Sequence, residues 1–487
     1  MRASRPLVCP LVTLLALTVG ASPHAWSEEP DEVPDLGTRH TGDDWPGFLG
    51  PTGDSKSAET GILTNWPAEG PKLVWQKRLG HGYGMPTISR GRLFQFDRQG
   101  DQARLTCMKS ETGEPLWKFQ YPTGYEDLYG YDNGPRCSPV VDDERVYLLG
   151  AEGVLHCLRV VDGSELWKVD TADEFGVIQN FFGVGSTPVV EGDLLIVQVG
   201  GSPEESKRVA PGQLNQVKPN GTCVVSFDKR TGEVKYKLGD DLASYAGPVL
   251  ATIRGRRWCF VFARSGLLAF EPASGQIDFQ FPWRAATLES VNASNPVVVD
   301  DEVFISETYG PGSTLLKVRP GHYDVVWQDA KRSREKKMQT HWNTCVHHEG
   351  HLYGSSGRHT ENAELRCIEW ATGNVKWSVP DLGRASLLYA DGHFICLTEH
   401  GAVLLIKANP AKFEVVAQSI LPVKEAGPQR FDDGPARLLN YPAWAAPILT
   451  HGLLYLRGRD RLACLELIPL KDGERRAKSA KGGKNEL

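Results

Sequence analysis

The sequence predicts an all-β, eight-bladed β-propeller made of four-stranded antiparallel blades. The first observation is a phrase that recurs along the chain: a leucine, a cysteine two residues later, a glycine six residues after that and a tryptophan four residues further on. The phrase occupies residues 105–117, 155–167 and 365–377, and weaker copies occupy 224–236 and 267–279. Internal similarity with a period of roughly 50 residues is typical of propellers and solenoids.

The second observation is an apolar strand that opens each repeat, in most cases directly after a proline. Short β-branched and aromatic runs follow, separated by turn pairs such as Asp-Gly and Glu-Gly, and this pattern predicts antiparallel meanders. Four strands per repeat and eight repeats make a propeller over residues 71–470. The eight openings are at Pro86, Pro139, Pro188, Pro248, Pro296, Thr344, Leu387 and Pro447.

The third observation concerns the two ends of the predicted ring. The eighth repeat stops at residues 461–470 and lacks its own glycine-to-tryptophan strand, whereas residues 72–79 (KLVWQKRL) resemble that missing strand. We therefore expect the N- and C-terminal strands to share one blade, which would close the ring and cover free sheet edges.

Large aromatic residues recur at one position of the repeat, where we expect them to wedge between neighbouring blades. Burial of roughly 200 Å² by such a side chain corresponds to at most about 5 kcal/mol of stabilisation. A glycine four residues earlier is expected to supply a turn with positive φ. The predicted docking residues are Trp75, Trp117, Trp167, Tyr236, Phe279, Trp327 and Trp377, and the glycines are Gly113, Gly163, Gly232, Gly275 and Gly373.

Residues 1–27 have the pattern of a secretory signal peptide. Arg2 and Arg5 precede an apolar run from Leu7 to Gly20, and small residues follow it. The run is short for a transmembrane helix, so we expect a soluble periplasmic or secreted protein. Its removal changes the formal net charge from −6 to about −8, which argues against nucleic acid as a partner.

Four further segments stand apart from the repeats. Residues 28–70 predict an extended lead-in, for which Trp45 and Phe48 are the expected anchors, and residues 471–487 predict a disordered, basic tail. A long insertion occupies residues 201–222. A basic run at residues 331–337 is interpreted as a solvated loop.

Nine cysteines remain after residue 27, and four of them share one repeat position that holds serine or alanine in other blades. Equivalent positions in different blades do not meet, so we expect reduced, buried thiols there. These four are Cys107, Cys157, Cys367 and Cys464. Pairing stays open for the others, which are Cys137, Cys223, Cys259, Cys345 and Cys396.

Over about residues 70–470 the recurring phrase resembles the tryptophan-docking repeat of the pyrroloquinoline quinone (PQQ) propeller superfamily. The resemblance implies the propeller fold. It leaves the activity open, because that superfamily includes quinoprotein alcohol and glucose dehydrogenases. It also includes the propeller subunit of the outer-membrane β-barrel assembly machine, which binds no quinone.

Several features that the resemblance would require of a quinoprotein alcohol dehydrogenase are absent from the sequence. There is no pair of adjacent cysteines and no Cys-x-x-Cys-His haem motif, and the acid pairs at 142–143 and 300–301 fall in predicted turns. His347 and His348 are adjacent on a predicted strand and face opposite sides of the sheet, so they are poorly placed to share a metal ion. We predict no metal and no cofactor, with PQQ and calcium as the alternative.

The segments that lead into the innermost strands are the best candidates for a binding site. In a propeller they converge on one face of the central channel, and here they are dense in aromatic and hydrogen-bonding residues, which suits a planar, sugar-like or peptide ligand. Arg136 and His341 are the sharpest individual candidates, as a cationic and a switchable donor. The full set is His81, Tyr83, Asp132, Asn133, Arg136, Asn180, Phe181, Phe182, Asn292, His341, Trp342, Asn440, Tyr441 and Trp444.

Three functions remain open at this point. We favour a non-catalytic propeller that binds a protein or peptide partner in the cell envelope, as a scaffold or assembly factor and as a monomer or a subunit of a complex. The alternatives are a PQQ-dependent dehydrogenase of alcohols or sugars, and a propeller that binds a carbohydrate or small molecule. The fold alone does not choose among them.

Overall fold

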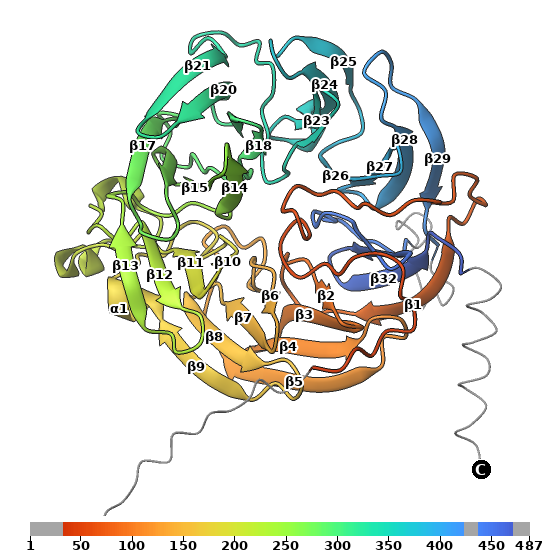
Figure 1. The fold of residues 1–487 in the computed structure, drawn as a ribbon, viewed down its shortest axis with the longest axis horizontal. Helices are drawn as coiled ribbons and strands as arrows, with labels where there is room; N and C mark the ends of the chain where they lie inside the picture. The colour runs from red at the N-terminus through yellow and green to blue at the C-terminus, as the bar shows by residue number, and fades with distance from the viewer. Residues whose placement is uncertain (1–32, 423–436, 471–487) are drawn as a thin grey trace, which may run out of the picture. The chain divides into compact units, whose positions relative to one another are not determined.

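A computed structural model describes residues 33–422 and 437–470. Within these residues, 32 strands form eight four-stranded antiparallel sheets, arranged as blades around a ring (Figure 1). The prediction of an eight-bladed propeller is confirmed. The predicted signal peptide and the predicted basic tail lie outside the described residues.

In each blade an inner strand borders the centre of the ring and the fourth strand lies at its rim. Blade 1 contains β2 (Thr87–Ser89), β3 (Arg92–Gln99), β4 (Gln102–Lys109) and β5 (Pro115–Pro122). Blade 2 contains β6 (Val140–Asp142), β7 (Arg145–Leu149), β8 (Val154–Arg159) and β9 (Glu165–Asp170). Blade 3 contains β10 (Val189–Glu191), β11 (Leu194–Gln198), β12 (Val224–Asp228) and β13 (Val234–Leu238). Blade 4 contains β14 (Val249–Ile253), β15 (Arg256–Phe262), β16 (Gly266–Phe270) and β17 (Ile277–Pro282).

The second half of the ring repeats this arrangement. Blade 5 contains β18 (Val297–Val299), β19 (Glu302–Glu307), β20 (Gly312–Arg319) and β21 (His322–Gln328). Blade 6 contains β22 (Val346–His348), β23 (His351–Ser356), β24 (Glu364–Glu369) and β25 (Val375–Val379). Blade 7 contains β26 (Ala385–Ala390), β27 (His393–Thr398), β28 (Ala402–Lys407) and β29 (Val415–Ile420). Blade 8 contains β30 (Ile448–Thr450), β31 (Leu453–Arg457), β32 (Arg461–Glu466) and β1 (Lys72–Arg78).

The eighth blade closes the ring. Its outer strand β1 comes from the N-terminal side of the chain and pairs antiparallel with β32, with Trp75 opposite Cys464. The predicted closure by N- and C-terminal strands is confirmed. Because β1 pairs with β32 along its length, β32 has no free edge that could pair with another chain.

Aromatic side chains at the repeated position join each blade to the next. In five seams an indole N–H donates to a backbone carbonyl oxygen of the following blade, over distances of 2.8 to 3.2 Å. The donor and acceptor residues are Trp75 and Ser110, Trp117 and Val160, Trp167 and Lys229, Trp327 and Trp370, and Trp377 and Asn409. In two further seams the Tyr236 hydroxyl donates to the Pro272 carbonyl oxygen, and the Phe279 ring lies 5.0 Å from that of Tyr323. Blade 7 differs, because Ala417 stands at the equivalent position.

The glycines of the repeat have two structural reasons to be glycine. Gly113, Gly163 and Gly232 have φ between 69° and 76°, a region that L side chains rarely adopt. The docking ring of the preceding blade also lies directly against them. A Cβ atom on Gly163 would stand 2.4 Å from the Trp117 ring. The sequence suggested only the first reason.

The nine cysteines of the described residues are all buried and unpaired. In the strand register Cys107, Cys157 and Cys464 each lie opposite a docking tryptophan, where a small side chain leaves room for the indole. Burial raises the pKa of the Cys137 thiol to about 12, so this thiol is protonated and unreactive at neutral pH.

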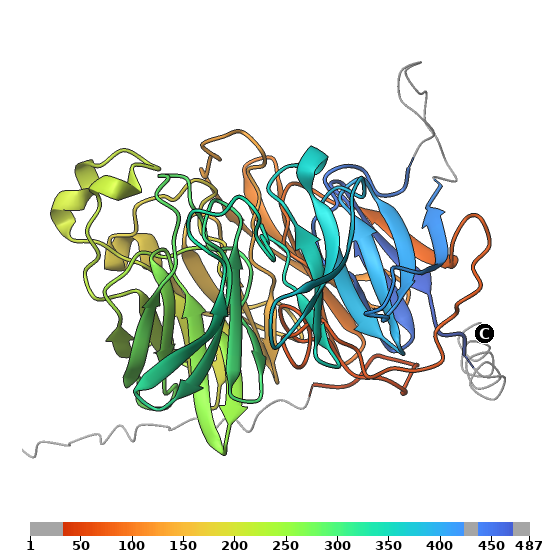
Figure 2. The same ribbon diagram turned by 90° about the horizontal axis from the view of Figure 1, so that it is seen from above.

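The lead-in fastens to the inner strands of four blades. Trp45 is buried and pairs with Ile88 of β2, the Pro46 carbonyl oxygen accepts from the Val141 N–H of β6, and Lys56 pairs with Tyr389 of β26. The Asp43 carbonyl oxygen accepts from the Thr450 hydroxyl of blade 8. Figure 2 shows this segment in red along one side of the ring.

The few helices lie in connections between strands. The short helix α1 (Thr171–Phe175) is capped by Asp170, which accepts from two N–H groups of its first turn. The insertion at 201–222 carries the 3₁₀ helices η1 (Glu204–Arg208) and η2 (Leu214–Gln216), and η3 (Thr360–Asn362) precedes β24. In the part of the chain that is described, no helix has the length and apolar character needed to cross a bilayer.

Candidate functional site

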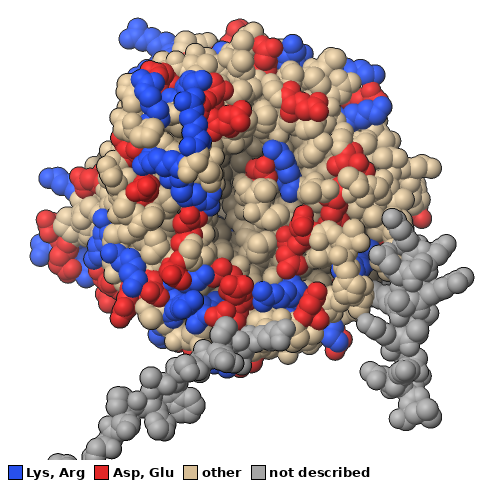
Figure 3. Space-filling view, viewed as in Figure 1, with Lys and Arg blue, Asp and Glu red and all other residues tan. Residues whose placement is uncertain are grey.

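A cavity of about 650 Å³ lies at the centre of the ring. The segments that lead into the inner strands supply much of its lining, and Phe48, Leu49 and Ser55 of the lead-in also border it. This volume is typical of pockets that hold a small molecule or a short segment of chain. Figure 3 shows the ring hollowed near its centre, with mainly uncharged side chains bordering the hollow.

One side of the cavity is an aromatic surface that we call the first wall, formed by Tyr129, Tyr131, Phe181, Phe182 and Tyr245. The Phe182 ring lies 5.7 Å from that of Tyr129, 6.0 Å from that of Tyr131 and 5.6 Å from that of Tyr245. Tyr129 and Tyr131 are 51% and 58% exposed. The first wall therefore presents ring surface at the cavity mouth that is not covered by other described residues.

The first wall is held from behind by buried contacts. Leu214 and Val217 of the 201–222 insertion pack with Phe181 in one apolar cluster. The Tyr245 hydroxyl accepts from the Phe182 N–H over 2.8 Å. The Asp127 carboxylate accepts from Arg136 over 2.5 Å, and this pair is almost completely buried, so it fixes the loop that carries Tyr129 and Tyr131. The insertion and this ion pair give the wall a fixed shape.

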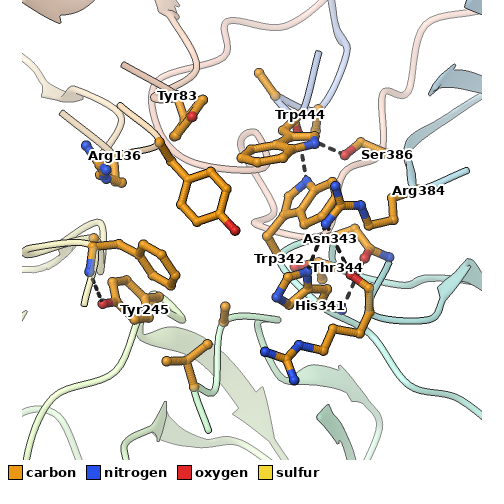
Figure 4. Close-up of a pocket in the computed structure, with 18 of the residues that line it drawn as sticks. Tyr83, Arg136, Tyr245, His341, Trp342, Asn343, Thr344, Arg384, Ser386 and Trp444 are labelled. Carbon is orange, nitrogen blue, oxygen red and sulfur yellow. Dashed lines mark hydrogen bonds between the residues drawn. The ribbon is translucent and has the colours of Figure 1, made fainter. Parts of the chain in front are cut away.

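The opposite side of the cavity is a second wall, formed by Tyr83, His341, Trp342, Tyr441 and Trp444. The Trp342 and Trp444 rings lie 4.7 Å apart, and the Trp342 indole N–H donates to the Trp444 carbonyl oxygen over 3.2 Å. The Tyr83 ring lies 4.9 Å from that of Trp444. Figure 4 shows Tyr245 on one side of the open space and Trp342 and His341 on the other.

A buried ion pair organises the second wall. The Arg384 guanidinium donates to the Glu399 carboxylate at 2.6 and 2.9 Å, and it lies 4.3 Å from the Trp342 ring. The Trp444 indole N–H also donates to Glu399, over 3.2 Å. Burial opposes ionisation of this carboxylate, but the hydrogen bonds from Arg384 outweigh it and lower the pKa of Glu399. Glu399 thus fixes both a cation and an aromatic ring.

His341 lies between Arg384 and Tyr309. Its Nδ1 is 3.5 Å from Arg384 Nη1, and its Nε2 is 3.2 Å from the Tyr309 hydroxyl oxygen. Burial and the charges of Arg384 and Arg358 lower the pKa of His341 from 6.5 to about 3. The imidazole is therefore neutral at any physiological pH.

The structure brings together eight of the fourteen residues that the sequence proposed for this site. Those lining the cavity are Tyr83, Arg136, Phe181, Phe182, His341, Trp342, Tyr441 and Trp444. Their role in binding stays a prediction. Two of them have surroundings that the sequence did not indicate: the Arg136 guanidinium is paired with Asp127, and burial lowers the pKa of His341 to about 3.

The other six residues do not line this cavity and instead hold loops in place. Asp132 accepts from the Gly134 N–H, Asn133 accepts from the Asp127 N–H, and Asn180 accepts from the Phe181 N–H. Asn292 is fully buried and donates to the Ala263 carbonyl oxygen. His81 pairs with Asp132 over 3.2 Å, and Asn440 donates to Asp460 over 3.2 Å. The density of polar residues in these segments reflects loop structure as well as lining.

Sequence reasoning missed several lining residues. Tyr245 and Arg384 were within the segments considered but were not singled out. Tyr129 belongs to the tyrosine-rich run YEDLYGYDNG, which was a usable signal. Tyr309 and Arg358 come from connections after the second strands of blades 5 and 6, which the inner-strand rule does not cover. In the basic run, Lys331, Arg332 and Arg334 are exposed, as expected of a solvated loop. Lys336 differs, because it is buried and donates to the Ala330 carbonyl oxygen.

The cavity does not fit a calcium–PQQ site. Its lining acids are Glu289 and Glu361, both exposed, and the described residues contain no cluster of three His, Cys, Asp or Glu side chains placed to hold a metal ion. Of the buried acids near the lining, Asp127 and Glu399 are paired with arginines, and the Glu307 carboxylate accepts from the Ser290 hydroxyl and the Gly310 N–H. Calcium binding prefers several convergent carboxylate or carbonyl oxygens, which this lining does not offer.

The comparisons with known proteins agree with this architecture. The sequence profile of the PQQ_2 family, described as outer membrane protein assembly factor BamB, matches residues 60–203 and 131–379. BamB from Moraxella catarrhalis is similar in structure, with a TM-score of 0.52 and 13% identity over 82% of this chain and 98% of that one. The quinohemoprotein alcohol dehydrogenase from Comamonas testosteroni has a TM-score of 0.58 and 10% identity over 88% and 81% of the two chains. No curated protein sequence matches. At these identities the structural neighbours establish the fold alone.

Proposed function

The chain belongs to the PQQ_2 family, described as outer membrane protein assembly factor BamB, and from this premise we propose that it is a non-catalytic, extracytoplasmic binding propeller. Its central cavity takes a segment of a partner protein in the cell envelope. The protein thereby acts as a scaffold or assembly factor.

The two facing aromatic walls are the observation that carries this proposal. Tyr131 and Tyr441 are 58% and 44% exposed, whereas Trp342 and Trp444 lie deeper and are fixed by hydrogen bonds. Large aromatic rings are enriched at protein interfaces, because they bury much surface at a small cost in conformational entropy.

The titratable groups at the cavity support binding over chemistry. The buried carboxylates of Asp127 and Glu399 are each held by an arginine, and His341 is neutral. General acid–base catalysis needs a group that reaches the ligand and has a pKa near the working pH. Burial lowers the pKa of His341 to about 3, and Glu307, whose pKa burial raises to about 7, is not among the lining residues.

Site-specific photo-crosslinking in the cell envelope tests the proposal. A benzoylphenylalanine residue at Tyr131 should give a discrete adduct with a protein, and the same residue at Val375, which is 46% exposed on the outer strand β25, should not. Trp342→Ala, which removes part of the second wall, should abolish the Tyr131 adduct. Adducts of equal yield at both positions would contradict the proposal. So would calcium-dependent binding of PQQ in calorimetry.

A carbohydrate ligand is the second candidate, favoured by the exposed ring faces of Tyr129, Tyr131 and Tyr441. Sugar rings stack on such faces. Thermal stabilisation by a glycan, lost in Tyr131→Ala and without a protein adduct at this position, would replace the partner protein with this candidate.

A further inference from the structure

The part of the cavity between blades 5 and 6 contains an arginine that is not neutralised. Arg358 lines the cavity, is exposed, and holds its guanidinium 4.3 Å from the Tyr309 ring. Throughout residues 33–422 and 437–470, no carboxylate oxygen lies within 4.0 Å of its guanidinium nitrogens. The other two lining arginines, Arg136 and Arg384, are paired at 2.5 and 2.6 Å. Arg358 is therefore the cation at this site that is available to a ligand.

The hydrogen bonds of the second wall determine whether the Tyr309 hydroxyl accepts from His341 or donates to it. Arginine only donates, so Nδ1 of the neutral His341 accepts from Arg384, and the imidazole proton must be on Nε2. This Nε2–H donates to the Tyr309 hydroxyl oxygen over 3.2 Å. The Tyr309 hydroxyl proton then has no acceptor among the described residues. Burial raises the pKa of Tyr309 to about 12, so this proton is present at neutral pH.

Two donors thus lie side by side at one edge of an aromatic slot. A chain of hydrogen bonds runs from the Glu399 carboxylate through Arg384 and His341 to the Tyr309 hydroxyl. The Arg358 guanidinium lies over the Tyr309 ring. A carboxylate accepts such bonds well, because hydrogen bonds to an ionised partner are shorter and stronger than those between neutral groups. The adjoining Trp342 and Trp444 rings offer an apolar surface next to the position of this carboxylate.

We propose that the cavity binds a carboxylate that adjoins an aromatic side chain. The carboxylate contacts Arg358 and the Tyr309 hydroxyl, and the ring occupies the slot between Trp342 and the first wall. This inference rests on the proposed function, since it specifies the chemistry of the bound segment. The carboxylate comes from an acidic side chain or from the C-terminus of the partner.

Four small probes test this chemistry and distinguish the two sources. Acetyl-phenylalanine carries a terminal carboxylate, acetyl-Phe-Asp-amide carries a side-chain carboxylate, and acetyl-phenylalaninamide and acetyl-Phe-Asn-amide are their neutral counterparts. Ligand-observed NMR and calorimetry on the full chain should show at least one acidic probe binding roughly tenfold more tightly than its neutral counterpart. The better acidic probe identifies the source.

Matched variants locate the contact. Arg358→Gln should bring the acidic probe down to the affinity of its neutral counterpart, and Tyr309→Phe, which keeps the ring, should weaken only the acidic probe. Arg334→Gln removes an equal charge from an exposed position that is not among the cavity-lining residues and should change neither affinity. Circular dichroism of each variant checks that the fold is retained.

Two results would overturn the inference. Equal affinity of acidic and neutral probes would show that the cavity does not recognise a carboxylate. The proposed binding of a partner segment would be unaffected by this result. Absence of binding by all four probes would reject a carboxylate beside an aromatic ring. The photo-crosslink at Tyr131 decides independently whether any protein segment binds, so the two failures are distinguishable.

Discussion

The seams between blades and the walls of the central cavity are both built from aromatic side chains, but they use these side chains differently. In the seams the indole N–H donates to a carbonyl oxygen of the next blade, as from Trp75 to Ser110 over 2.9 Å and from Trp327 to Trp370 over 2.8 Å. In the cavity the rings of Tyr131 and Tyr441 are left about half exposed. Rings fixed by the neighbouring blade stabilise the fold, whereas rings with open faces are available to a ligand.

The largest expected effect is the loss of a seam ring. Trp75 is 8% exposed and packs at the closure of the ring, 6.0 Å from the Tyr455 ring. Trp75→Ala should lower the free energy of unfolding by about 3–5 kcal/mol, because it leaves a cavity and removes one of the two hydrogen bonds that the Ser110 carbonyl oxygen accepts. Urea denaturation followed by fluorescence measures this.

Tyr131→Ala is the matched change in the cavity. Its side chain is 58% exposed, so stability should change by less than about 0.5 kcal/mol. Binding of a partner segment should nevertheless be lost. Similar losses of stability in Trp75→Ala and Tyr131→Ala would show that the two regions do not differ as described.

A smaller effect separates the two roles of the repeat glycines. Gly163 has a φ of 75° and lies against Trp117, whereas Gly192 has a φ of 59° and no heavy atom within 4 Å of its would-be Cβ. Gly192→Ala should cost about 1 kcal/mol, from backbone strain alone. Gly163→Ala should cost about 2 kcal/mol more, because the indole must also move. Equal melting temperatures of the two variants would mean that docking places no constraint on the glycine.

The same contrast explains what was predictable from the sequence. The seams follow from repetition: Cys107 with Trp117 and Cys157 with Trp167 recur at fixed spacing, so strand order, closure and docking could be inferred. The cavity is built from positions that do not repeat. Nothing in the sequence indicates that Asp127 forms an ion pair with Arg136.

Distance along the chain hid the rest of the cavity. Arg384 meets Glu399 across 15 residues, and Tyr309 meets His341 across 32. The first pair belongs to blade 7, and the second joins a connection within blade 5 to the connection between blades 5 and 6. Which side chains meet depends on how these connections turn toward the axis of the ring, and periodicity carries no information about this. The sequence could identify the segments that line the cavity, but it could not identify the groups that pair with their charged residues.

The smallest effect concerns the pH dependence of stability. The pKa of His341 is about 3 in the folded protein and 6.5 in the reference state. Below pH 6.5 the unfolded chain takes up a proton that the folded chain does not, so the stability contributed by neutral His341 is complete above pH 6.5 and is lost as the pH falls. The slope is at most about 1.4 kcal/mol per pH unit. His341→Gln keeps a donor and an acceptor but does not titrate, so the stability difference between wild type and variant should shrink from pH 7.5 to pH 5.5 by about 1 kcal/mol. Urea denaturation of both proteins at the two pH values measures this change. A difference independent of pH would mean that His341 titrates normally, and the proton on Tyr309 would then no longer be fixed by its neighbours.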